Sequence, residues 1–254
     1  MIRRALLALA ILAGASGTAA QTPAPRTVEF VPRTLFYMGA ARLSGDDIRF
    51  SWDADLGGEF DFVDYGSGRV TFFGNYQVVM GDELKAFDPN QGNYVLGGAV
   101  SARLRPVELA AVFYHQSRHL SDREKTRPID WNMMGVRASR AFIAGAMHVD
   151  ARADLRTVIM RTNVDYRWEF DGRVRADRVL RPGVGVLLSA TLRHLGVDGA
   201  RGGQTGGRVE GGVRFDGGAG AVELFVAAER RLDPYPLEFS TMTWATAGFR
   251  LLSR

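Results

Sequence analysis

From residue 34 onward, apolar and polar residues alternate with a period of two, which is typical of half-buried β-strands. The clearest example is 164–175, where one face is apolar or glycine and the other is charged. The apolar face consists of Val164, Tyr166, Trp168, Phe170, Gly172 and Val174, and the charged face of Asp165, Arg167, Glu169, Asp171, Arg173 and Arg175. The same division recurs in 50–62, 147–156 and 208–216. The pattern predicts strands with one apolar and one charged face.

The composition of the charged faces indicates where they point. They carry both signs of charge, and arginine almost replaces lysine, since Lys85 and Lys125 are the chain's only lysines. A solvent-facing sheet would be rich in lysine and threonine instead. In transmembrane barrels, apolar side chains face lipid and polar ones face the lumen. We therefore expect the charged faces to line the inside of a barrel.

The spacing of the alternating segments gives about twelve strands, and the connections between them differ in length. The expected strands are 34–43, 47–63, 69–80, 92–105, 107–120, 131–142, 145–157, 162–176, 183–195, 206–216, 219–231 and 241–252. Connections after even-numbered strands are mostly short, and those after odd-numbered strands are mostly long. Short periplasmic turns and longer outer loops are characteristic of outer-membrane barrels. The sequence thus predicts an all-β, antiparallel transmembrane barrel over 34–254, located in the bacterial outer membrane. Trp52, Trp131, Trp168, Trp244, Tyr94 and Tyr114 are available for its aromatic girdles.

The first residues read as an export signal. Arg3 and Arg4 precede an apolar run, and small residues up to Ala20 form a cleavage site, which predicts a signal peptide over 1–20. The prolines in 21–33 predict an extended leader. No later stretch is long and apolar enough for a transmembrane helix, which excludes a polytopic helical membrane protein.

Composition excludes several kinds of chemistry. The chain has no cysteine, so it has no disulfide, thiolate metal site or cysteine nucleophile. The net charge is only +4, and basic residues alternate with acidic ones along the chain. Nucleic-acid binders cluster their basic residues on one face. We therefore expect no nucleic-acid partner, and the oligomeric state stays open.

One segment could carry chemistry, at the outer end of the fifth expected strand. His115 and Ser117 share the lipid-facing parity of that strand and lie about 6.6 Å apart along it. At this spacing the imidazole can act as general base for the hydroxyl. A third group should orient the imidazole, and Asp130, Asn132 and Asp122 are the candidates.

Two other interpretations of this segment stay open. The polar residues could lie in the headgroup zone and only be solvated there. Alternatively His115, His119 and Asp122 could bind a metal ion, although residues four apart on a strand are about 13 Å apart. The sequence requires no cofactor and leaves calcium open.

The charged lumen residues also allow two interpretations. They could line a selective channel, or they could fill the interior as ion-pair networks. Filling is the favoured expectation for a barrel of this size. The residues concerned are Arg152, Asp154, Arg167, Glu169, Asp171, Arg173, Arg214 and Glu223.

The segment 113–122 resembles the signature of a bacterial outer-membrane family of unknown function, His-Gln-Ser-Ser-His-Leu-Gly-Asp. Six positions match, and Arg118 and Ser121 replace the second serine and the glycine; the matches are His115, Gln116, Ser117, His119, Leu120 and Asp122. That resemblance implies an outer-membrane barrel and no established activity.

His115 and Ser117 are also similar to the pair in outer-membrane phospholipase A and lipid A 3-O-deacylase. Those enzymes carry a membrane-facing His-x-Ser near the outer leaflet, with a polar or acidic third member in the following strand. The resemblance implies a lipid acyl-ester hydrolase that acts on phospholipid or lipopolysaccharide. The alternative is a non-catalytic structural or channel-forming barrel.

Overall fold

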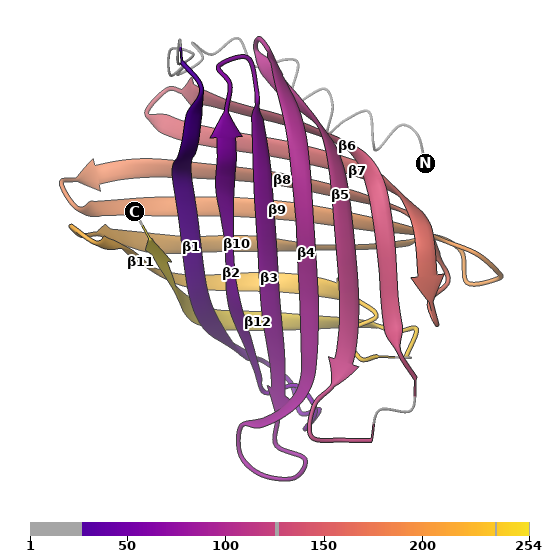
Figure 1. Ribbon diagram of the computed structural model, residues 1–254. Helices are drawn as coiled ribbons and strands as arrows, with labels where there is room; N and C mark the ends of the chain where they lie inside the picture. Colours follow the sequence, from indigo (N-terminus) through magenta and orange to yellow (C-terminus); the bar gives the residue numbers. More distant parts are fainter. Residues whose placement is uncertain (1–26, 125–126, 237, 254) are drawn as a thin grey trace.

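The computed structural model describes residues 27–124, 127–236 and 238–253, and its chain forms a closed barrel of antiparallel strands (Figure 1). Each strand pairs with its neighbours in sequence, and β1 closes on β12. The strands are β1 (Glu29–Leu43), β2 (Trp52–Asp64), β3 (Arg69–Gly81), β4 (Asp88–Leu104), β5 (Val107–Leu120), β6 (Ile129–Ala144), β7 (Met147–Thr162), β8 (Tyr166–Arg181), β9 (Val184–Val197), β10 (Gln204–Asp216), β11 (Gly220–Leu232) and β12 (Thr241–Ser253). The predicted twelve-stranded antiparallel barrel is thus confirmed.

Four strand starts differ from the prediction by four or five residues. β2 begins later, at Trp52 rather than 47, and β8 begins later, at Tyr166 rather than 162. The other two begin earlier. β1 begins at Glu29, so residues that were expected to end the extended leader belong to the barrel. Arg33 explains this, because it pairs with Asp61 of β2 and its guanidinium reaches the Asp61 carboxylate at 2.9 Å. β4 begins at Asp88 rather than 92. The expected signal peptide over 1–20 lies outside the described residues.

The two ends of the barrel carry connections of different length (Figure 1). At one end the turns are tight, and Gly145 and Gly183 occupy left-handed backbone conformations there, with φ of 61° and 75°. Glycine reaches these angles without steric cost. The longer connections, among them 44–51, 82–87 and 233–240, gather at the other end. We call these the inner end and the outer end, because short turns face the periplasm in such barrels.

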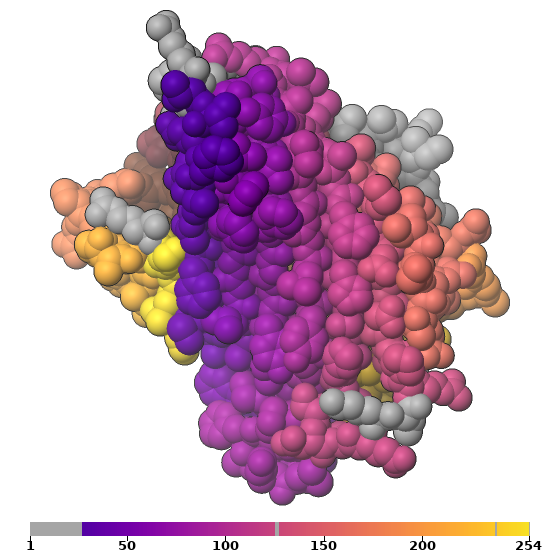
Figure 2. Space-filling view, viewed as in Figure 1, coloured from indigo at the N-terminus to yellow at the C-terminus, as the bar shows by residue number. Residues whose placement is uncertain are grey.

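The outer wall is apolar between these ends. Leu96, Val136 and Val226 are each at least 60% exposed, as expected for side chains that face lipid. The side chains of β1–β7 form a continuous surface in Figure 2. Other exposed apolar residues of this belt are Met38, Leu56, Phe60, Phe72, Val100, Leu109, Phe113, Met134, Leu155, Leu188, Val209, Val213, Leu224, Phe249 and Leu251. Among the described residues, no helix is long and apolar enough to cross a membrane.

The outer half of the lumen is filled by packed side chains, which we call the outer plug. It consists of two buried clusters: Tyr114, Trp131, Met133, Tyr166, Leu195 and Leu232, and Leu43, Phe50, Val79 and Trp244. Trp131, Trp244 and Tyr114 therefore lie inside the barrel and not in an aromatic girdle. Glu169 lies beside the first cluster and accepts hydrogen bonds from Arg156 at 2.6 Å and Arg193 at 2.7 Å. The expected filling of the lumen by ion pairs is found here.

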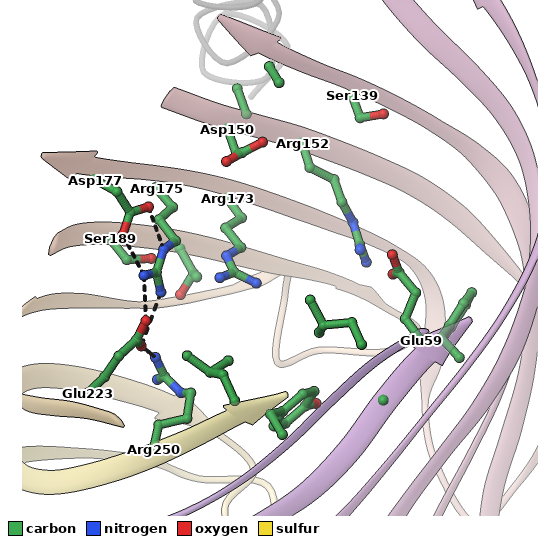
Figure 3. A pocket seen from close by; sticks show the side chains of 18 of the residues that line it. Glu59, Ser139, Asp150, Arg152, Arg173, Arg175, Asp177, Ser189, Glu223 and Arg250 are labelled. Atoms are coloured by element: carbon green, nitrogen blue, oxygen red, sulfur yellow. Dashed lines mark hydrogen bonds and ion pairs between the residues drawn. The ribbon is translucent and has the colours of Figure 1, made fainter. Parts of the chain in front are cut away.

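The inner half of the lumen is hollow. A cavity of about 1770 Å³ extends from the inner end to Phe73 and Tyr114, whose rings pack 4.7 Å apart at the edge of the outer plug. Arginines and carboxylates from most strands line it (Figure 3). The expectation of a filled interior is wrong for this half, because the ion pairs lie along the wall and leave the centre open.

This arrangement predicts the electrical behaviour of the protein. Since the outer plug closes the lumen, the wild-type barrel in a planar bilayer should give no stepwise ion conductance. Stable conductance steps that rise in proportion to salt concentration would show that Trp131, Tyr166 and their neighbours do not close the lumen at rest.

Candidate functional site

A polar patch interrupts the apolar outer wall close to the outer end. His115, Ser117 and His119 share the outer face of β5, directly beyond the exposed Phe113. Ser117 itself is only 8% exposed. The parity prediction for this face therefore agrees with the structure: the reactive residue types lie on the wall that meets lipid.

The imidazole of His115 is oriented by Asn132 of β6. The two residues are direct cross-strand partners, and His115 Nδ1 lies 2.8 Å from Asn132 Oδ1. An amide oxygen can only accept, so Nδ1 donates and Nε2 keeps the lone pair that a general base needs. Asn132 is thus the one of the three expected orienting groups that contacts His115.

The other two candidates for the orienting group lie elsewhere. Asp130 is the cross-strand partner of Ser117, one pair further toward the outer end. Asp122 lies beyond the end of β5, where a left-handed backbone with φ of 52° turns the chain away.

A second imidazole contacts Ser117, and the sequence interpretation did not assign it this role. His119 Nε2 lies 3.2 Å from Ser117 Oγ. Tyr94 packs edge-on against the His119 ring at 5.4 Å and stacks on Tyr76 at 4.5 Å. His119 shares the parity of Ser117 and is two residues away, so the signal for this contact is present in the sequence. The serine is flanked by His115 on one side and His119 on the other.

The expected alternative of a metal site is not assembled. Within the described ranges, no three His, Cys, Asp or Glu side chains converge as a metal ion requires, and this applies to His115, His119 and Asp122. The reason is strand geometry: His115 contacts Asn132, His119 contacts Ser117, and Asp122 has left the strand.

The residues that alternate with the patch point into the outer plug. Arg118 donates a hydrogen bond to the backbone carbonyl of Asp233 and lies over the ring of Trp131, 5.6 Å from its centroid. Trp131 packs against Tyr166 with ring centroids 5.0 Å apart. β5 and β6 therefore carry the polar patch on their outer face and residues of the outer plug on their inner face.

Comparison with known proteins was informative only at the level of structure. No family model matches the chain. No curated protein matches its sequence. The family suggested by segment 113–122 is therefore not established by sequence.

Several solved structures share the fold. An outer-membrane channel from Pseudomonas putida F1 aligns with a TM-score of 0.55 and 10% identity, over 92% of this chain and 99% of that chain. The outer-membrane phospholipase A dimer of Salmonella typhi with bound calcium aligns with a TM-score of 0.53 and 12% identity, over 92% and 94%. The Escherichia coli outer-membrane phospholipase A, in a form whose active-site asparagine is replaced by alanine, aligns with a TM-score of 0.52 and 11% identity, over 92% and 95%.

These similarities show the fold, and together with the apolar belt they give the location. The chain is an outer-membrane β-barrel protein, as the alternation and the loop lengths predict. Proteins with this fold include both a lipid-acting enzyme and a channel, so the fold alone does not distinguish these functions.

Proposed function

We propose that this protein is a lipid acyl-ester hydrolase whose reactive residues face the membrane. Ser117 is the nucleophile, His115 is its general base, and Asn132 holds the base in orientation. One observation carries the proposal: the bond between His115 Nδ1 and Asn132 Oδ1, beside Ser117 and on the lipid-facing wall. The three residues have the arrangement of a catalytic triad, in which an orienting group holds the general base beside the nucleophile.

The chemistry starts from the resting contact between Ser117 and His119. Rotation about the Cα–Cβ bond of Ser117 turns Oγ from His119 toward Nε2 of His115. His115 then takes the hydroxyl proton while Oγ attacks the acyl carbonyl, and the resulting imidazolium donates that proton to the leaving alkoxide. A water molecule, activated by the same Nε2, hydrolyses the acyl-serine and releases a fatty acid.

Asn132 suits this role because it stays neutral. Its amide oxygen fixes the tautomer of His115 and accepts the same hydrogen bond when the ring becomes protonated. Asp130, the other expected orienting group on β6, lies opposite Ser117 instead of His115. We therefore assign the orienting role to Asn132.

The position of the patch indicates the class of substrate. It adjoins Phe113, Leu96 and Met134, which are exposed toward the acyl chains of surrounding lipids. Toward the outer end it adjoins polar residues and the longer loops. An ester at the boundary between acyl chain and headgroup would meet Ser117 at this depth, so phospholipid and the lipid A part of lipopolysaccharide are the proposed substrates.

Fold similarity supports the proposal without carrying it. Escherichia coli phospholipase A shares the barrel and has an asparagine in its active site. In the present chain, Asn132 supplies the amide that contacts a histidine two residues before a serine.

The direct test is acyl release by the wild-type protein. Refolded protein is incubated with phosphatidylethanolamine vesicles and separately with lipid A, with and without calcium, and released fatty acids are measured by mass spectrometry. We expect release from at least one lipid, and none from the same protein after heat denaturation. If the folded protein releases no acyl chain under any of these conditions, the hydrolase proposal is wrong and a non-catalytic barrel remains.

A further inference from the structure

One arginine in the inner cavity differs from its neighbours. Arg173 of β8 extends into the open centre of the cavity (Figure 3). Its guanidinium forms no hydrogen bond or ion pair with any residue in 27–124, 127–236 or 238–253. Its neighbour Arg175, two residues along the same face, is held by Asp177 and Glu223. Arg173 thus presents an uncompensated charge inside the barrel wall.

The carboxylates around Arg173 are already committed to other arginines. Glu223 accepts from three guanidiniums, those of Arg175 at 2.6 Å, Arg214 at 3.0 Å and Arg250 at 2.7 Å. Glu210, which is within electrostatic range of Arg173, is bound by Arg208 and Arg250. Arg175, Arg214 and Arg250 also each bind a second carboxylate, that of Asp177, Asp216 and Glu210 respectively. These ion pairs are complete among themselves and leave Arg173 without a carboxylate partner among the described residues.

A second arginine lies beside Arg173. Arg152 of β7 is its direct cross-strand partner, and the two side chains extend toward the same opening in Figure 3. Arg152 is fixed by Asp154 at 2.8 Å and by the hydroxyl of Tyr114 at 3.0 Å. Like charges placed directly opposite each other on a sheet destabilise it. The pair gains a compensating partner when an anion lies between them.

We propose that Arg173 and Arg152 form a binding site for a soluble oxyanion that enters the cavity from the inner, periplasmic end. The ligand carries a phosphate or carboxylate group, because a guanidinium forms paired, charge-assisted hydrogen bonds with two such oxygens. The cavity is large enough for a small metabolite and ends at the outer plug, so the site binds its ligand without passing it outward. It is separated from Ser117 by the barrel wall and does not depend on lipid hydrolysis.

The absence of cysteine from the chain allows a direct test. Thr191 of β9 is the cross-strand neighbour of Arg173 on its other side, and it lines the cavity. In Thr191→Cys, the introduced thiol is treated with one of two methanethiosulfonate reagents, the anionic sulfonatoethyl or the cationic trimethylammonioethyl form. The labelling rate of each reagent is divided by its rate of reaction with a small free thiol in solution. The ratio of the two rates reports the local potential, because any change in thiol ionisation affects both reagents equally.

We expect the anionic reagent to be favoured in Thr191→Cys and the preference to fall about tenfold when Arg173→Gln is added. Inorganic phosphate should slow labelling of Thr191→Cys and have no effect once Arg173 is replaced. The control is Arg167→Gln, an arginine of the same strand that pairs with Asp198, is 67% exposed and does not line the cavity. It should change neither the ratio nor the protection.

Two results would overturn the proposal. The first is a rate ratio, or a phosphate effect, that is the same with and without Arg173 in variants that retain the folded electrophoretic mobility. The second is protection by phosphatidylglycerol, added to detergent micelles that hold the refolded protein, without protection by inorganic phosphate. This would place a lipid headgroup and not a soluble anion at the site.

Discussion

Replacing Ser117 by alanine should reduce acyl release to the uncatalysed level while the barrel remains folded. The reason is that no acyl-enzyme can form without Oγ, whereas the hydroxyl contributes little to folding. Its one hydrogen bond among the described residues is the 3.2 Å bond to His119. The measurement is fatty-acid release by mass spectrometry, with heat-modifiable electrophoretic mobility as the check of folding. Gln116→Ala is the matched control, because Gln116 is the adjacent residue and points into the lumen. Loss of activity in both variants would indicate structural damage instead of lost chemistry.

Substitutions of the two histidines distinguish the general base from the histidine that only hydrogen-bonds Ser117 at rest. His115→Ala should lose as much activity as Ser117→Ala, and the double variant should lose no more, because members of one catalytic unit fail together. His119→Ala should keep a measurable fraction, since it removes only the resting hydrogen bond of Ser117. If His119→Ala is the more damaging change, the base is His119 and the bond between His115 and Asn132 is structural.

The second large effect concerns stability. Glu169→Gln should lower the free energy of unfolding by about 3–5 kcal/mol, because it leaves Arg193 without a carboxylate among the described residues and Arg156 with only the partly exposed Asp171. Glu169 is 1% exposed, so water cannot compensate the loss. Unfolding by urea in lipid vesicles, followed by tryptophan fluorescence, measures the change.

Its control is an ion pair of similar composition outside the plug. Asp198 binds Arg161 and Arg167 but is 41% exposed, so Asp198→Asn should cost less than about 1 kcal/mol. Equal destabilisation by the two variants would show that burial in the outer plug does not set the strength of these pairs.

The fold was largely predictable because the same alternation recurs along the chain. It fails at Tyr166, which was expected on the apolar outer face but lies in the outer plug, because the register of β8 with β9 shifts between Tyr166 and Trp168. In the segment 165–175 each charged residue alternates with an apolar residue or glycine, and the loop lengths give the orientation. The early start of β4 was not predictable. Asp88, Asn90 and Gln91 read as a polar loop, yet all three are fully buried, with Asp88 bound by Arg123 and Asn90 donating to the carbonyl of Arg49. Such partners are distant in sequence and leave no periodic signal.

For the candidate site, the sequence defined the face but not the register. Parity alone placed His115 and Ser117 on the lipid side. The choice between Asp130 and Asn132 depended on the pairing of β5 with β6 across the longer connection 121–128, which the sequence does not determine. The tight turn at Arg105-Pro106 does determine the pairing of β4 with β5, and counting back from it places Tyr94 opposite Ser117.

The division of the lumen into a filled and a hollow half could not be read from the chain. Arg156 and Arg173 are both inward-facing arginines in the same kind of alternating pattern, yet one is buried against Glu169 and the other extends into open space. What distinguishes them is a contact with another strand: Arg156 lies over the ring of Tyr114 of β5, 4.1 Å from its centroid, whereas Arg173 lines the cavity.

The outer plug also has a mechanical consequence for the site. Trp131 precedes Asn132 in the chain, and Arg118 follows Ser117. Inside the barrel these two residues contact each other, Trp131 packs against Tyr166, and Arg118 donates to the carbonyl of Asp233. Reactive groups must be held to within about half an ångström, which requires stiff supporting elements. The solid half of this barrel is the half that bears the histidine, serine and asparagine. The strands should therefore be stiffest where the outer wall carries its polar side chains, and most compliant around the cavity below.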